Sequence, residues 1–457
     1  MVTTTPVPRG PAKSIPERRV LEIWQSSVQR RTDLITEEYG PVSIIYPGRP
    51  NDGRGADLTD AVIATKQGVL KGDIEIHVKS SDWRAHGHHL DPEYNKAILH
   101  VVLQNDGGTN TILQDGTAIP TLALDAFAEI QPARRVSTAF TPVLAPPCKD
   151  NPEAAPLLDA AGEVRFLNKA EGFENDISPR GAAETLYRGI MTALGYSKNK
   201  EAMGELAGLV SLTELEEIMA VAETENACLL QIQSRLLGIA GLLPSQSLRP
   251  QRTKASPTAL FPDPLELELE QLWRNHSPGM SADAWHFFKV RPGNSPVRRI
   301  AAMSHLLVRF RKQGILFGLR EELENDTDGR ALEQALLTKA EDYWERYLDF
   351  GIPVTGKAPA LIGGDRAAEI IINVILPFFT AYGRAAGQPL LIEKARDIFR
   401  LFRSPPENSL EKHMRKQLGI PPEMAATAQR RQGLIHIYKT FCTQGKCGEC
   451  LLGGATF

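Results

Sequence analysis

Four ionisable side chains share one face of a predicted strand. Residues 72–83 read Gly-Asp-Ile-Glu-Ile-His-Val-Lys-Ser-Ser-Asp-Trp, and the two-residue repeat of a strand sends Asp73, Glu75, His77 and Lys79 to one face and apolar side chains to the other. Asp is a poor strand former, so this face is unusual. Carboxylates are the oxygen ligands of Mg²⁺ and Mn²⁺. The segment predicts hydrolysis at a divalent ion, and the alternative is a solvated strand with internal salt bridges.

Asp57 precedes Glu75 by eighteen residues and lies just before another β-rich run. An Asp at a strand start, followed after a hairpin by Glu, one residue and a basic residue, resembles the restriction-endonuclease-like nucleases, whose motif is Asp, then Asp or Glu, one residue and Lys. The resemblance implies that Asp57 and Glu75 hold Mg²⁺ or Mn²⁺ and that His77 or Lys79 acts on the attacking water, whose pKa the ion lowers. His77 stands where the motif has Lys, and Lys79 follows two residues later.

A histidine-rich stretch follows, reading His-Gly-His-His-Leu-Asp over residues 86–91. Neutral imidazole suits Zn, Mn and Fe. The metallo-β-lactamase order His-x-His-x-Asp-His is not met, because Asp91 comes one place late and no His follows it. We expect a loop that hydrogen-bonds its own turn or contacts phosphate beside Glu75. The alternative is a metal-dependent hydrolase of a small molecule that uses His86, His88 and Asp91.

Three of the five cysteines form the pattern C-x4-C-x2-C at Cys442, Cys447 and Cys450. This spacing matches three ligands of a plant-type [2Fe–2S] ferredoxin, and an amphipathic helix over residues 434–441 is predicted to lead into it. The odd cysteine count argues against a disulfide framework. The pattern predicts a bound metal centre, either an iron–sulfur cluster such as [4Fe–4S] or zinc.

A fourth ligand must come from upstream, where Cys148 lies in an irregular Pro-Pro-Cys segment and is the preferred candidate. His436 is a nearby alternative, and Cys228 falls in a predicted apolar helix, where a buried small hydrophobe is the simpler interpretation. One distant Cys with a C-terminal trio resembles the arrangement around the [4Fe–4S] cluster of CRISPR-associated and recombination-associated nucleases, although their final spacing is C-x2-C-x5-C.

The elements that position these residues indicate an α+β protein. The chain has 457 residues with a net charge of −3, enough for two or three domains. We predict a disordered lead-in at 1–17, a mixed-sheet, restriction-endonuclease-like domain at 18–150, a mainly helical domain at 151–433, and a helix with a Cys-rich tail at 434–457. The predicted helices are 182–194, 212–222, 227–242, 264–275, 297–313, 330–349, 367–385 and 393–402.

Composition also bears on partners and location. The most apolar run, residues 370–379, contains Asn and Pro and is too short to span a membrane, so we expect a buried helix and a cytoplasmic protein without a membrane partner. Residues 394–446 hold 11 Lys or Arg against 4 Asp or Glu, which suits either a nucleic-acid-facing patch or a solvated helix face. The segment from Arg291 to Arg299 would place a helix N-terminus against phosphate, or its Pro residues are helix-start signals.

The chain as a whole resembles an uncharacterised bacterial domain-of-unknown-function family, number 2851. The likeness is carried by Asn51, Gly55-x-Asp57, the strand around Glu75, His86-Gly-His88 and residues 285–299, and it implies no established activity. We therefore expect a divalent-metal-dependent nuclease with a Cys-ligated centre. The rivals are a non-catalytic nucleic-acid- or protein-binding scaffold of the same fold, and the small-molecule hydrolase. The sequence does not indicate an oligomeric state.

Overall fold

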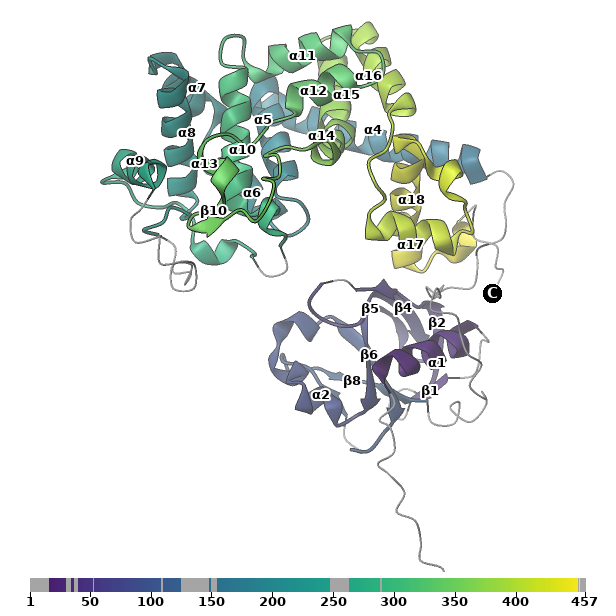
Figure 1. The fold of residues 1–457 in the computed structure, drawn as a ribbon. Helices are drawn as coiled ribbons and strands as arrows, with labels where there is room; N and C mark the ends of the chain where they lie inside the picture. The colour runs from purple at the N-terminus through teal and green to yellow at the C-terminus, as the bar shows by residue number, and fades with distance from the viewer. Residues whose placement is uncertain are drawn as a thin grey trace, which may run out of the picture. The chain divides into compact units, whose positions relative to one another are not determined.

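The chain folds into two compact units (Figure 1). The computed structural model describes residues 16–29, 34–36, 40–51, 53–107, 110–124, 148, 154–246, 263–287, 290–450 and 452. The first unit comprises Met1–Leu158, Asn408–Ala425 and Gly433–Phe457, and the second comprises Asp159–Glu407 and Ala426–Gln432. Residues 1–15 of the predicted lead-in lie outside the described residues. The C-terminal segments belong to the same unit as the sheet, whereas the sequence suggested a separate tail.

The first unit is built on a mixed sheet with the strand order β1-β2-β4-β5-β6-β9, and β3 pairs with β4. The strands are β1 (Leu34–Thr36), β2 (Gly40–Tyr46), β3 (Arg49–Pro50), β4 (Leu58–Thr65), β5 (Gly68–Lys79), β6 (Ala97–Gln104) and β9 (Thr121–Ala123). Short connections make β2, β4 and β5 antiparallel, whereas β6 runs parallel to β5 and β9 runs parallel to β6. The predicted α+β class with an N-terminal mixed sheet is confirmed.

The two faces of this sheet differ in polarity. Helix α1 (Glu17–Gln29) carries buried Val20, Trp24 and Val28 at helical spacing, and these pack in one apolar cluster with the apolar face of the sheet, which includes Ile74 and Ile76. The opposite face is covered by the connection from β5 to β6 and by the hairpin β7 (Thr111–Ile112) and β8 (Ala118–Ile119). That connection contains α2 (Asp82–Ala85), η1 (His88–Leu90) and η2 (Pro92–Tyr94). Polar groups buried on this second face need hydrogen-bond partners there.

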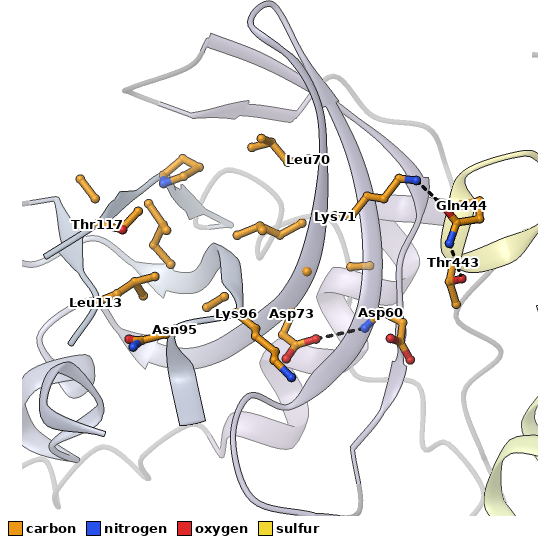
Figure 2. A pocket seen from close by; sticks show the side chains of 17 residues that line it. Asp60, Leu70, Lys71, Asp73, Asn95, Lys96, Leu113, Thr117, Thr443 and Gln444 are labelled. Carbon is orange, nitrogen blue, oxygen red and sulfur yellow. Dashed lines mark hydrogen bonds between the residues drawn. The ribbon is translucent and has the colours of Figure 1, made fainter. Parts of the chain in front are cut away.

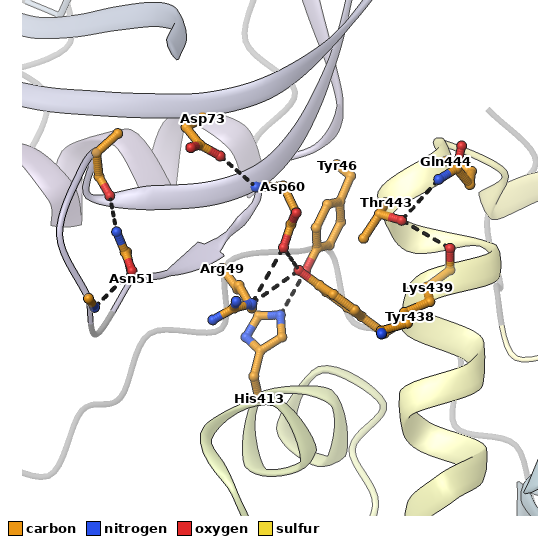
Figure 3. A network of polar contacts seen from close by, with 12 residues as sticks. Tyr46, Arg49, Asn51, Asp60, Asp73, His413, Tyr438, Lys439, Thr443 and Gln444 are labelled. Carbon is orange, nitrogen blue, oxygen red and sulfur yellow. Dashed lines mark hydrogen bonds and ion pairs between the residues drawn. The ribbon is translucent and has the colours of Figure 1, made fainter. Parts of the chain in front are cut away.

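C-terminal segments complete the first unit through polar contacts with β2, β3 and β4 (Figure 3). They include α17 (Ser409–Gln417) and the end of α18 (Ala428–Thr440), which confirms the predicted helix before the cysteines. The Tyr438 hydroxyl donates to Asp60 Oδ2 and accepts from Arg49 Nε at 3.2 Å. Tyr46 Oη lies 2.8 Å from His413 Nε2. Asp60 adopts a positive φ of 63° within the irregular pairing of β4 and β5, so this network holds an otherwise unfavourable backbone conformation.

The second unit is mainly helical and encloses one large apolar core. Its helices are α4 (Ala154–Arg180, which begins in the first unit), α5 (Ala182–Leu194), α6 (Lys200–Leu209), α7 (Leu212–Val221), α8 (Glu225–Ile239), α9 (Pro264–Trp273), α10 (Pro296–Arg309), α11 (Ile315–Asn325), α12 (Arg330–Leu336), α13 (Tyr343–Arg346), α14 (Gly364–Ile370), α15 (Leu376–Ala385) and α16 (Pro389–Leu401). A π-helical segment, η5 (Ile371–Ile375), joins α14 to α15. Across the part of the chain that the structure describes, no helix has both the length and the apolar character to cross a membrane.

One predicted helix in this unit is interrupted and ends early. Residues 330–349 form α12, α13 and the short strand β10 (Tyr347–Asp349), which pairs with β11 (Ile352–Pro353). Asp342 has φ of 51°, a left-handed conformation that cannot continue a right-handed helix. The predicted helix over 367–385 is present but contains the π-helical segment.

Candidate metal centre

Asp57 and Glu75 are neighbours because β4 and β5 pair with Leu58 opposite Ile74. The Asp57 amide donates to Glu75 Oε2 at 2.9 Å, and Asp57 Oδ2 accepts from the Ile76 amide at 3.2 Å. Glu75 is 5% exposed. Asp57 retains solvent access as a whole residue, but partial burial of its carboxyl group and the charge of Glu75 raise its pKa to about 7. Two carboxyl groups therefore share one site and resist simultaneous ionisation unless a cation joins them.

His77 is fixed by a chain of buried hydrogen bonds behind it. His77 Nδ1 lies 2.9 Å from His100 Nε2, His100 Nδ1 lies 2.8 Å from Thr111 Oγ1, and Thr111 Oγ1 lies 3.0 Å from Thr121 Oγ1. Burial and the neighbouring imidazoles lower the pKa of His77 to about 2, and burial with His88 lowers that of His100 to about 3. Both rings are neutral. If each Nδ1 carries the proton, His77 Nε2 presents its lone pair toward Glu75 Oε1, which is 3.5 Å away.

Two more imidazoles reach the same point from the β5–β6 connection. His88 Nε2 is 3.3 Å from Glu75 Oε1, and His86 Nδ1 is 3.2 Å from His77 Nε2. The ligand atoms of His77, His86 and His88 all lie within 4.8 Å of one another. Gly87, with φ of 78°, makes the left-handed turn between the last two. Three nitrogen donors are thus gathered at one position, and a carboxylate oxygen of Glu75 lies beside two of them, a donor set that suits Mn, Zn or Fe.

Aromatic residues of the connection hold these imidazoles in place. The Tyr94 ring lies 4.0 Å from the His88 ring between centroids, and Trp83 contacts both His88 and His100. Trp83 Nε1 donates to the Ile112 carbonyl at 3.0 Å. Burial and the nearby Glu75 and Asp57 raise the pKa of Tyr94 well above its usual value, so its hydroxyl stays protonated. The connection is therefore a packed support and not a loose loop.

The other predicted residues of this region lie outside the cluster. Lys79 Nζ is 3.7 Å from Asp106 Oδ2 at the exposed end of β5. Asp91 pairs with Arg54 at 3.2 Å and caps the Glu93 amide, so His86 and His88 come together without it. Asp73 Oδ1 accepts from the Asp60 amide at 3.1 Å. Alternation along β5 was predicted correctly, but it does not bring Lys79 back toward Glu75.

Asp73 borders an open hollow of about 560 Å³, seen in Figure 2. Lys71, Asn95, Lys96 and Thr117 also line it. Lys71 points toward Gln444, whose Oε1 accepts from Lys71 Nζ at 2.7 Å. Burial raises the pKa of Asp73, whereas the hydrogen bond from the Asp60 amide and the charge of Lys96 oppose this effect. The hollow therefore combines the cationic groups of Lys71 and Lys96 with the Asn95 amide, and its lining residue Asp73 lies two residues before Glu75 on β5.

In the helical unit, the predicted phosphate-facing arginines differ in environment. Arg291 is exposed, whereas Arg299 is 3% exposed. The Arg299 guanidinium donates to the carbonyls of Gly293 and Leu361, and burial lowers its pKa. Arg299 therefore braces the backbone ahead of α10 in this structure.

All five cysteines are outside disulfides. Cys148, Cys442, Cys447 and Cys450 belong to the first unit, and Cys228 is buried in α8 of the second. The sequence alone indicates no role for His100, Thr111 or Tyr94. The interruption of an otherwise apolar strand by His100 was the visible signal, since a buried imidazole requires a partner.

These features define the class: an α+β protein with a mixed-sheet unit that bears a His and carboxylate cluster, joined to a helical unit. The chain belongs to the family described as "Protein of unknown function (DUF2851)", whose model matches residues 17–408. The family resemblance seen in the sequence is thereby confirmed. No curated protein and no solved structure matches the chain.

Proposed function

We propose that the first unit is a metal-dependent phosphodiesterase with a nuclease-like site. The observation that carries this proposal is the convergence of His77 and His88 on one buried carboxylate oxygen, Glu75 Oε1, at 3.5 and 3.3 Å. His86 adds a third nitrogen within the same cluster. A divalent ion at this position would bind the buried His77 imidazole and the Glu75 carboxylate, and half-buried His88 and exposed His86 would reach it from the β5–β6 connection.

The position of the acidic pair supports phosphodiester chemistry. Asp57 directly precedes β4, and Glu75 lies across the hairpin on β5, which is the arrangement implied by the resemblance to restriction-endonuclease-like nucleases. A bound ion would lower the pKa of a water and neutralise charge on the phosphoryl oxygens. Asp57, whose amide donates to Glu75 Oε2, would supply the second carboxylate beside that ion.

The donor set distinguishes this site from a purely oxygen-ligated magnesium site. Three imidazoles favour Mn²⁺, Zn²⁺ or Fe²⁺ over Mg²⁺. His100 would act as a positioning residue, because its contact with His77 Nδ1 fixes which ring nitrogen of His77 faces the ion. Lys96 and Asn95, in the adjoining hollow, would contact a substrate phosphate.

The test compares Glu75→Gln with Glu171→Gln, an exposed change on α4. With Mn²⁺ and a panel of single- and double-stranded DNA and RNA, Glu75→Gln should lower cleavage by about 100-fold or more and weaken Mn²⁺ binding in titration calorimetry. Glu171→Gln should leave both unchanged. Lys79→Gln should have a small effect, since Lys79 faces Asp106. Full cleavage by Glu75→Gln would refute the assignment.

A small-molecule hydrolase at the same ion is the second candidate, because His86 and His88 do converge. A simple phosphodiester such as bis(4-nitrophenyl) phosphate separates the two. If the original protein hydrolyses this compound but cuts no nucleic acid, and Glu75→Gln abolishes the hydrolysis, a small-molecule substrate is favoured. Nucleic-acid binding that is indifferent to metal and to Glu75→Gln, without any cleavage, would favour the non-catalytic scaffold.

A further inference from the structure

Four cysteines that are widely separated in the sequence meet in the first unit. Cys442 lies within electrostatic reach of Cys148, Cys447 and Cys450, and Cys148 lies within reach of Cys447 and Cys450. Cys442 is 6% exposed, and the other three are partly buried. Thiols that are neither paired in disulfides nor dispersed in an apolar core are most simply explained as ligands.

The backbone of the C-terminal segment is folded for this purpose. Two short turns, η7 (Cys442–Gln444) and η8 (Cys447–Glu449), place one cysteine at the start of each, and Cys450 follows directly. Gly445, with φ of 70°, joins them in a left-handed conformation, and the Lys446 amide returns to the Phe441 carbonyl at 2.9 Å. Two consecutive short turns therefore carry all three cysteines of this segment.

A buried amide stands beside the sulfurs. Gln417 of α17 is 4% exposed, and its Nε2 donates to Cys442 Sγ at 3.8 Å and also hydrogen-bonds Cys148. An amide that donates to two sulfurs fits an outer hydrogen bond to metal-bound thiolates, the kind that tunes iron–sulfur centres.

The spacing of the sulfurs separates the two metal classes. Tetrahedral zinc with Zn–S distances of about 2.3 Å holds its sulfurs about 3.8 Å apart. Among the described residues, three histidines have ligand atoms that all lie within 4.8 Å of one another. No three of the four cysteine sulfurs lie that close together. Any three of these sulfurs therefore include at least one pair more than 4.8 Å apart, which exceeds the spacing around a single zinc and fits a polynuclear cluster, whose ligands bind different metal atoms.

From this geometry we infer that Cys148, Cys442, Cys447 and Cys450 bind an iron–sulfur cluster of the [4Fe–4S] class. The site is distinct from the Glu75 cluster and does not depend on the proposed hydrolysis. The cluster would fasten the C-terminal segment to the sheet beside β2 and β4, where Gly445 already lies against Ile45 and Val62.

The first test uses the unaltered full chain, purified without oxygen. We expect about four irons and four acid-labile sulfides per chain, visible absorption that bleaches on reduction, and an electron paramagnetic resonance signal after dithionite. One zinc per chain without iron would overturn the iron–sulfur assignment. Absence of any metal, including after reconstitution with iron and sulfide, would overturn the site itself.

Matched variants test the ligand set. Cys148→Ser and Cys442→Ser should each lose most of the iron and the visible absorption, whereas Cys228→Ser, in the helical unit, should retain both. Full iron in Cys148→Ser would refute the participation of Cys148. Hydrogen exchange provides a readout that does not depend on activity, because residues 434–450 should exchange faster in the two depleted variants and at the original rate in Cys228→Ser. Unchanged exchange in an iron-depleted variant would refute the fastening role.

Discussion

The attachment of the C-terminal segment to the sheet depends on glycine at position 445, because this residue has no Cβ. A Cβ at this position would lie 2.9 Å from Val62 Cγ1 and 3.3 Å from Ile45 Cγ2, and the residue has φ of 70°. In Gly445→Ala, the left-handed backbone costs about 1 kcal/mol, and the overlap with buried Val62 and half-buried Ile45 adds about 1–3 kcal/mol. We therefore expect the docked state of this segment to lose about 2–4 kcal/mol.

Hydrogen exchange with mass spectrometry measures this loss locally. Amides that close the turns, such as Lys446 N–H bonded to the Phe441 carbonyl, should exchange about 30- to 700-fold faster. Gly448→Ala is the matched control, because a Cβ there meets nothing within 4 Å. In a double-mutant cycle with Val62→Ala, the overlap should appear as a coupling energy of about 1–3 kcal/mol. Equal exchange in the two alanine variants, or no coupling to Val62, would refute this reasoning.

Three further predictions concern other parts of the molecule. Burial and Arg49 lower the pKa of His413 to about 4, so the unfolded chain takes up this proton first on acidification. The free energy of unfolding should therefore fall by up to about 3 kcal/mol between pH 6.5 and 4. In urea unfolding at both pH values, His413→Gln should not show this part of the fall. Tyr438→Phe, which deprives Asp60 of a donor, should destabilise the first unit by about 1–2 kcal/mol in urea, and an unchanged midpoint would contradict the network. Arg299→Lys leaves carbonyl acceptors unpaired and should cost the helical unit about 2–4 kcal/mol, whereas exposed Arg291→Lys should melt like the original protein.

The acidic part of the candidate site follows from sequence periodicity, because a hairpin places Asp57 against Glu75 whatever surrounds it. The recruitment of His86 and His88 does not follow, since it depends on how Trp83 and Tyr94 pack the β5–β6 connection against the sheet. Periodicity also placed Lys79 on the right face but could not show that Asp106 would hold it at the strand end.

The helices show a similar division. The predicted helix 182–194 is α5 to the residue, because its amphipathic pattern is strong. The long helix α4 was missed, since it contains Gly162, Gly172 and Pro179. At Gly162 a Cβ would lie 2.0 Å from the Gln429 carbonyl oxygen, so this glycine allows close helix contact and does not end the helix. Such a role depends on a partner far away in the sequence.

The chain leaves the sheet unit at Leu158 and returns to it at Asn408 and again at Gly433. During synthesis the strands therefore emerge long before the helices that supply Tyr438, His413 and the cysteine turns. Until those segments arrive, the nascent sheet must stay incomplete, with part of its surface exposed to association with other chains. For the same reason, a fragment that ends after β9 would lack parts of its own fold. A soluble version of this unit would require the C-terminal segments to be joined to the sheet by a short linker.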